Sequence, residues 1–241
     1  GTAGQGKTTV IKDFLLKWPN YKTTSKTYRD ALKAGKYPHS KLCNKEGQWA
    51  ILNHMVDELQ KYGKNDNVIF DRCPIDNLVY SMWAMDKESS DIDEDFLDKC
   101  IPIVRESMRL LDIIFFTPIT KVNKIPIEND GFREIDQEYI EEIDNLFKAI
   151  GYQYTHNFNR NPFFPVDDSP GFIEIFGSRE QRIALIGQYL DLGGELIEAT
   201  PTLTDAIESA NDPTDPELIK KLIGEQRESL QSEQFYKSIK I

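Results

Sequence analysis

The chain has 241 residues, of which 39% are hydrophobic, 29% charged and 11% aromatic. This balance is typical of a soluble globular protein and excludes collagen-like, low-complexity and wholly disordered chains. The net charge of −11 argues against a general nucleic-acid coat protein. Since the sequence shows no apolar run of roughly 18 residues and no charged-then-apolar leader, we expect a cytoplasmic protein without membrane contacts.

The first eight residues, GTAGQGKT, match the phosphate-binding pattern G-x-x-x-x-G-K-[ST] at every position. In such a loop, main-chain N–H groups converge on phosphate oxygens, Lys7 adds a positive charge, and the Thr8 hydroxyl binds Mg²⁺. The expected phosphate contacts are Gly1, Gly4, Gln5, Gly6, Lys7, Thr8 and Thr9. Because this loop normally follows a buried strand, a first strand is expected ahead of Gly1 and missing from this chain.

Apolar periodicity predicts the remaining elements in chain order. Helices are predicted over residues 9–18, 46–62, 74–84, 93–110, 136–150, 177–189 and 216–230. Strands are predicted over residues 21–28, 68–70, 113–116 and 172–176. Residues 119–133 are predicted to form a polar, proline-bearing loop. Short buried strands that alternate with helices predict an α/β fold in three layers, with a mainly parallel sheet flanked by helices.

The predicted strand at residues 68–70 ends in an acid and a base. Asp71 lies where phosphate-loop proteins place a carboxylate that binds Mg²⁺ directly or through water. Asp71 is alternatively a general base for an attacking hydroxyl. Arg72 follows at the carboxyl end of the strand, where ligands bind in open α/β sheets, and it is a candidate for gripping an acceptor phosphate.

Other polar side chains are candidate ligands. Arg133 precedes a predicted helix, where a lid could carry a cation over the transferred phosphoryl group; a local salt bridge is the alternative. Arg179 and Arg182 begin the helix after the last strand, and they either approach an adenine or are solvated.

The acceptor pocket has candidates in two segments. Arg29 follows the predicted second strand. Gln48 and Trp49 open the next helix, where an amide can read a base edge and an indole can stack on it, although Trp49 is more often a core residue.

These motifs together resemble one family. The loop GTAGQGKTT and the segments VIFDRCPIDNLVY, DGFREIDQEYIEEIDNLF and IEIFGSREQRIALIGQYL resemble P-loop kinases of the thymidylate-kinase and nicotinamide-riboside-kinase-like (NadR-type AAA domain) group, including bacteriophage members. The resemblance implies a P-loop NTPase fold and transfer of the γ-phosphoryl group of ATP, with Mg²⁺, to a nucleoside or nucleotide. It implies a kinase domain over residues 1–195 with a lid around 119–135, followed by an acidic, partly helical tail over 196–241.

By this resemblance Lys7 and Thr8 serve the phosphates and the metal, Asp71 and Arg72 the acceptor, and Arg133 the lid. Cys73 stands where relatives often carry serine. A phage member would work in the host cytoplasm. The oligomeric state is not implied.

The basic segment from Lys7 to Lys45 keeps a second hypothesis open. It holds ten basic residues against two acids, a local net charge of +8. Such a segment can bind DNA phosphates, and some phage relatives phosphorylate 5-hydroxymethyluracil within DNA. A third hypothesis is a nucleotide-dependent regulatory switch, although no guanine-reading N/T-K-x-D string is present.

Overall fold

The computed structural model describes residues 1–63, 66–121, 136–156 and 161–197. The chain divides into two units, Gly1–Leu196 and Ile197–Ile241, and every element named below belongs to the first. Arg133, most of the predicted lid and the predicted helix at 216–230 lie outside the described residues.

Along this unit, each strand is separated from the next by at least one helix. The helices are α1 (Lys7–Lys17), α2 (Tyr28–Gly35), α3 (Lys45–Gln60), α4 (Pro74–Asp86), α5 (Glu94–Ser107), α6 (Gln137–His156) and α7 (Arg179–Ile186). The strands are β1 (Lys22–Thr23), β2 (Val68–Ile69), β3 (Ile113–Phe116) and β4 (Gly171–Glu174). Short 3-10 helices cover Ser40–Leu42 (η1) and Met108–Leu110 (η2).

Side chains at the helix starts explain where several helices begin. The Asn44 carboxamide accepts from the Gly47 N–H at 2.9 Å ahead of α3, and Asp93 accepts from the Phe96 N–H at 3.0 Å ahead of α5. Pro74 opens α4, where its missing N–H has no intrahelical partner to lose. These starts confirm the predicted helices within a few residues.

The predicted strand over residues 21–28 is wrong for most of its length. Only Lys22 and Thr23 form β1, and Tyr28 is the first residue of α2. A capping box explains the helix, because Thr27 and Asp30 exchange side-chain and main-chain hydrogen bonds at its start. The Thr- and Tyr-rich composition of this segment favoured a strand, but the cap decides the local structure.

The strands of this unit pair in parallel. β1 pairs with β2, with Lys22 opposite Val68, and β3 pairs with β4 in a register that sets Ile113 opposite Gly171. A cavity of about 520 Å³ is lined by both β2 and β3. The strand expected ahead of Gly1 stays a prediction.

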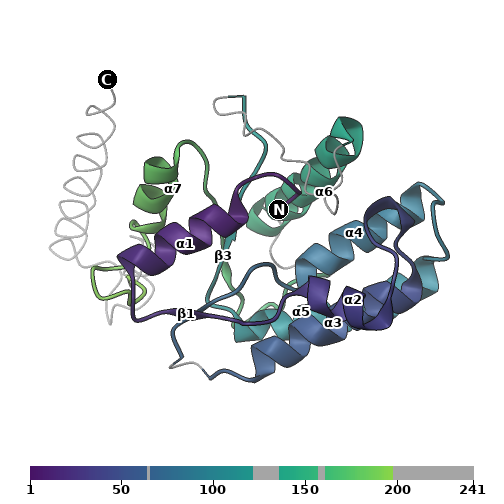
Figure 1. The fold of residues 1–241 in the computed structure, drawn as a ribbon, viewed down its shortest axis with the longest axis horizontal. Helices are drawn as coiled ribbons and strands as arrows, with labels where there is room; N and C mark the ends of the chain where they lie inside the picture. The colour runs from purple at the N-terminus through teal and green to yellow at the C-terminus, as the bar shows by residue number, and fades with distance from the viewer. Residues whose placement is uncertain (64–65, 122–135, 157–160, 198–241) are drawn as a thin grey trace, which may run out of the picture. The chain divides into compact units, whose positions relative to one another are not determined.

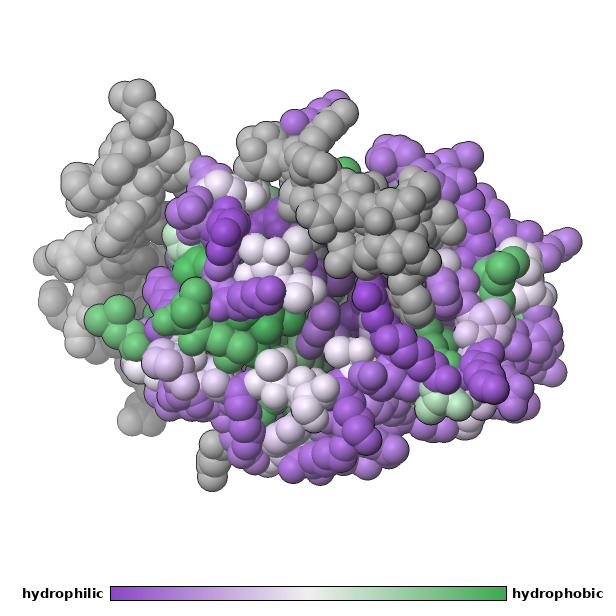
Figure 2. Space-filling model, viewed as in Figure 1, coloured by the Kyte–Doolittle hydropathy of each residue, from purple (hydrophilic) through white to green (hydrophobic). Residues whose placement is uncertain are grey.

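Helices pack on both faces of the strands, which gives three layers (Figure 1). α1 and α7 pack together on one face, and α3, α4, α5 and α6 pack among themselves. β3 shows the alternation: Phe115 packs with the α1 and α7 core, whereas Ile114 and Phe116 pack with the other core. Figure 2 shows apolar side chains gathered mainly where α1 and the strands lie, within a hydrophilic surface. The α/β fold with parallel strands is thereby confirmed, and the described strands form two separate two-stranded sheets.

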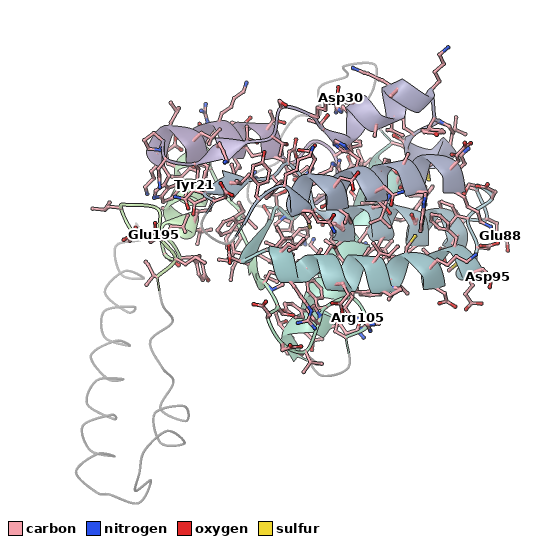
Figure 3. All side chains as sticks on the ribbon, turned by 90° about the horizontal axis from the view of Figure 1, so that it is seen from below. Tyr21, Asp30, Glu88, Asp95, Arg105 and Glu195 are labelled. Carbon is pink, nitrogen blue, oxygen red and sulfur yellow. The ribbon has the colours of Figure 1, made fainter. Side chains whose placement is uncertain are left out.

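The turn after α7 returns to the end of α1. The Tyr21 hydroxyl donates to the Gly194 carbonyl at 2.7 Å, and Tyr21 and Glu195 lie side by side (Figure 3). Across the part of the chain that the structure describes, no helix combines the length and apolar character needed to cross a membrane.

Candidate active site

The phosphate-binding loop adopts the backbone that its glycines permit. Gly4 and Gly6 have φ values of +76° and +71°, in the left-handed region that favours glycine. Gly6 is the N-cap of α1 and brings no side chain, so no side-chain hydrogen bond caps the first turn of this helix. The first N–H groups of α1 therefore remain available to an anion.

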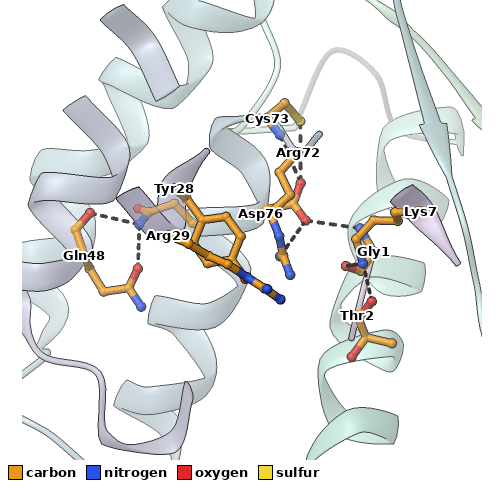
Figure 4. A network of polar contacts seen from close by, with 10 residues as sticks. Gly1, Thr2, Lys7, Tyr28, Arg29, Gln48, Arg72, Cys73 and Asp76 are labelled. Carbon is orange, nitrogen blue, oxygen red and sulfur yellow. Dashed lines mark hydrogen bonds and ion pairs between the residues drawn. The ribbon is translucent and has the colours of Figure 1, made fainter. Parts of the chain in front are cut away.

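The Lys7 ammonium folds back over the start of the same loop. Its Nζ donates to the carbonyl of Gly1 at 2.9 Å and to the carbonyl of Thr2 (Figure 4). Both acceptors are neutral carbonyls, and a phosphate oxygen is a stronger acceptor for an ammonium group. The lysine is thus held beside the loop in a position from which it can turn to a phosphate.

One cavity joins the loop to the predicted acceptor residues. It measures about 600 Å³, within the usual range of small-molecule sites. The predicted site residues that line it are Gly4, Gln5, Gly6, Lys7, Thr8, Thr9, Arg29, Gln48, Asp71 and Arg72. Gly1 does not line this cavity and instead lines the cavity between β2 and β3. Trp49 lines neither; it is 37% exposed and packs against Phe96, so the structure does not bring it to the acceptor pocket.

Asp71 follows β2 and presents an oxygen suited to a cation. Its Oδ1 atom is buried and has no hydrogen-bond partner among the described residues. A buried carboxylate oxygen without a donor is costly, and a metal ion would relieve that cost. Thr8 lines the same cavity and is exposed. These oxygens fit Mg²⁺, which usually takes one or two protein oxygens together with substrate phosphates. In the described ranges, no group of three or more His, Cys, Asp or Glu residues is placed so that it could hold a metal ion.

Arg72 is held between two aromatic rings on a strained backbone. Its φ of +83° is rare for a residue other than glycine. The guanidinium carbon lies 4.7 Å from the Tyr28 ring centroid and 5.2 Å from that of Tyr80. Burial alone would lower the pKa of Arg72, but Tyr80, Tyr28 and Asp76 together hold the pKa well above its usual value. Arg72 is therefore a rigid cation inside the cavity.

Asp76 anchors this cation, and sequence reasoning missed it. Its Oδ1 accepts from Arg72 Nη1 at 3.2 Å, and its Oδ2 accepts from the Cys73 N–H at 3.2 Å (Figure 4). Asp76 is buried, and the cations of Arg72 and Lys7 lie close enough to favour its charged form. The available signal was its position three residues after the N-cap of α4, where an acid closes a capping box.

Gln48 and Asn77 form a buried amide pair at the acceptor end of the cavity. Asn77 Nδ2 donates to the Gln48 side-chain oxygen at 2.5 Å and to the Gln48 carbonyl at 2.9 Å. Asn77 Oδ1 is buried without a hydrogen-bond partner in the described part of the chain. The cavity wall thus holds an acceptor that a ligand donor can satisfy.

The remaining predicted candidates take other roles. Arg29 Nε approaches the Tyr28 hydroxyl at 3.4 Å, on the cavity wall. Cys73 is buried beside Asp76, and burial raises the pKa of its thiol to about 12. Arg179 pairs with Asp13 on α1, whereas Arg182 is buried and binds the main chain of the phosphate loop; neither lines the cavity, and Arg182 is not solvated.

The basic segment of residues 7–45 is partly neutralised. Lys22, Lys41 and Lys45 form ion pairs with Asp66, Asp136 and Asp93, respectively. Since Lys7 belongs to the phosphate loop, fewer free cations remain for a DNA backbone than the local charge of +8 indicates.

Comparison with known proteins gives a family and a fold. A family model described as an AAA domain matches residues 1–163. No curated protein sequence matches the chain. Among solved structures, deoxyadenosine kinase from M. mycoides, with products dCMP and a flexible dCDP bound, superposes with a TM-score of 0.56 at 16% identity, over 78% of this chain and 94% of that one. At this identity the match shows a shared fold, the α/β fold of P-loop kinases.

Proposed function

The chain belongs to the AAA domain family whose model spans residues 1–163, and on that premise we propose that it is an ATP- and Mg²⁺-dependent kinase of nucleosides or nucleotides. The observation that carries the proposal is the shared cavity of about 600 Å³, which joins the phosphate loop to the acceptor residues. A donor bound at the loop and an acceptor bound beside α3 and α4 would meet in one compartment, as direct transfer requires. The fold shared with a deoxyadenosine kinase supports the same class of reaction.

The phosphate loop binds the donor in this proposal. The N–H groups of residues 4–9 receive the β- and γ-phosphates, and Lys7 exchanges its two carbonyl partners for a phosphate oxygen. Thr8 and Asp71 are the residues that would hold Mg²⁺. When bound, the ion neutralises charge on the β- and γ-phosphates.

Asp71 and Arg72 act on the acceptor. An acceptor oxygen forms a bond to the γ-phosphorus while the bond from that phosphorus to the bridging oxygen breaks and ADP leaves. The hydroxyl proton passes to the Asp71 carboxylate if this group serves as base rather than as metal ligand. Arg72, fixed by Tyr28, Tyr80 and Asp76, faces the phosphoryl group with its charge in place before the reaction.

The amide pair and Arg29 give the acceptor end its chemistry. Gln48 and Asn77 offer hydrogen-bonding groups of the kind that recognise a nucleobase edge. Arg29 adds a cation to the same wall, which suits a nucleoside monophosphate. A thymidylate-like acceptor is the finer form of this proposal.

Transfer of label from γ-labelled ATP tests the proposal. Acceptors are deoxynucleosides, their monophosphates including dTMP, nicotinamide riboside, and duplex DNA with or without 5-hydroxymethyluracil. We expect label in a nucleoside or nucleotide, and none with Lys7→Ala. Label confined to modified DNA, with activity that falls steeply between 50 and 200 mM salt, would replace this function with a DNA-base kinase. Bound ADP without any transfer would favour a nucleotide-dependent switch.

A further inference from the structure

Arg182 is a buried cation without a carboxylate partner among the described residues. It lies on α7 and is only 5% exposed. Burial lowers the pKa of its guanidinium, and no charged group offsets this effect. Burying a charge without an opposite charge is costly, so the surrounding structure must hold Arg182 in place through other contacts.

Those contacts are two main-chain carbonyls from separate segments. Nη1 donates to the carbonyl of Gln5 at 2.6 Å, and Nε donates to the carbonyl of Gly177 at 3.1 Å. Gln5 lies at the middle of the phosphate loop, and Gly177, with a φ of +90°, lies in the turn between β4 and α7. The side chain of Arg182 therefore ties the loop to that turn.

Holding the Gln5 carbonyl also fixes the orientation of the next N–H group. The structure has no cis peptide in its described ranges, so the carbonyl of Gln5 and the N–H of Gly6 point in opposite directions from one planar unit. With the carbonyl turned toward buried Arg182, the Gly6 N–H faces away from α7. Gly6 lines the cavity that Arg182 does not line.

We propose that Arg182 is a positioning residue that presets the phosphate-binding loop. By holding the Gln5 carbonyl, it keeps the Gly6 N–H directed toward the phosphates before any nucleotide arrives. Its positive charge behind the loop also attracts the anion. This inference rests on the proposed function only in that the loop binds a polyphosphate. It differs from a direct contact between Arg182 and the adenine ring.

Two probes separate these roles: ADP, which carries an adenine, and inorganic tripolyphosphate, which carries none. Isothermal titration calorimetry gives both affinities for the wild type, Arg182→Gln and Arg182→Lys. We expect Arg182→Gln to weaken the binding of both probes by at least tenfold. Arg182→Lys keeps the positive charge but loses the planar guanidinium that donates to two carbonyls at once. We therefore expect Arg182→Lys to bind both probes more tightly than Arg182→Gln and more weakly than the wild type.

Arg109→Lys is the matched control. Arg109 also donates to a main-chain carbonyl, that of Asp167 at 2.8 Å, but it contacts no part of the loop. We expect its affinities to equal those of the wild type. If Arg182→Gln weakens the binding of ADP but leaves the binding of tripolyphosphate unchanged, the inference is overturned in favour of adenine contact. If neither affinity changes in Arg182→Gln, the inference is overturned outright.

A measurement on the wild-type protein covers the case in which the variants do not fold. The Arg182 Nε–H resonance should be protected from solvent exchange without ligand and should shift equally little with ADP and tripolyphosphate. A shift seen with ADP alone would contradict the positioning role. Wild-type protein that binds both probes but transfers no phosphoryl group would refute the kinase and leave this inference standing, whereas binding of neither probe would refute the inference itself.

Discussion

Replacing Asp76 with alanine should cost the protein a large part of its stability. The Asp76 side chain is 6% exposed and that of Arg72 is 10% exposed, so this ion pair is shielded from water. Asp76→Ala leaves the Arg72 guanidinium buried without its carboxylate and leaves the Cys73 N–H without its cap. Both losses act on the folded state.

The magnitude follows from these two contacts. Removing one partner of a buried pair costs about 3 kcal/mol or more, and losing a helix cap costs about 1 kcal/mol. Asp76→Ala should therefore lower the free energy of unfolding by about 4 kcal/mol. Asp76→Asn keeps an acceptor for the cap but loses the charge, so about 2 kcal/mol is expected.

Urea unfolding followed by circular dichroism measures both variants. Glu106→Gln is the control for Asp76→Asn, because both variants change a carboxylate to an amide. Glu106 pairs with Arg109 at the surface, so this control should cause no measurable loss in the free energy of unfolding. A loss below about 1 kcal/mol for Asp76→Ala would refute the reasoning, since the pair would then behave like a solvated one.

The remaining predictions concern the chemistry of the site and its buried thiol. Lys7→Ala should abolish phosphoryl transfer, and Asp71→Asn should reduce kcat by about two orders of magnitude. The label assay measures both effects. Full activity in either variant would show that another residue performs the role proposed for Lys7 or Asp71. Burial raises the pKa of Cys73 to about 12, so iodoacetamide at pH 8 should label this thiol only after denaturation, as mass spectrometry would show.

Local signals in the sequence were sufficient for most elements. The phosphate loop and α1 follow from glycine spacing and from apolar periodicity, and β3 was predicted at its observed bounds. α2 was missed because its eight residues are too few for periodicity to outweigh the strand-favouring threonines and tyrosines before it. The signal that decides it is the cap from Thr27 to Asp30.

Only those site residues that belong to a sequence motif were predictable. Lys7, Asp71 and Arg72 come from motifs, and the cavity brings them together. Asp76 and Asn77 follow the same motif. Asp76 binds locally, to Arg72 and the Cys73 N–H, whereas Asn77 binds Gln48, which is 29 residues away in sequence. Arg182 binds a carbonyl 177 residues away, a contact that no spacing rule anticipates.

The helix that starts at the phosphate loop ends beside an indole. Trp18 follows α1, is 1% exposed, and donates from Nε1 to the Asp191 carbonyl at 2.8 Å, beyond α7. An 11-residue helix is about 16 Å long, so Trp18 lies outside the range of direct contact with a ligand at the loop. In a variant whose Trp49 and Trp83 are replaced by phenylalanine, the fluorescence of Trp18 should therefore be insensitive to acrylamide while α1 and α7 stay packed. The molecule thus carries an intrinsic optical reporter of the scaffold behind the loop.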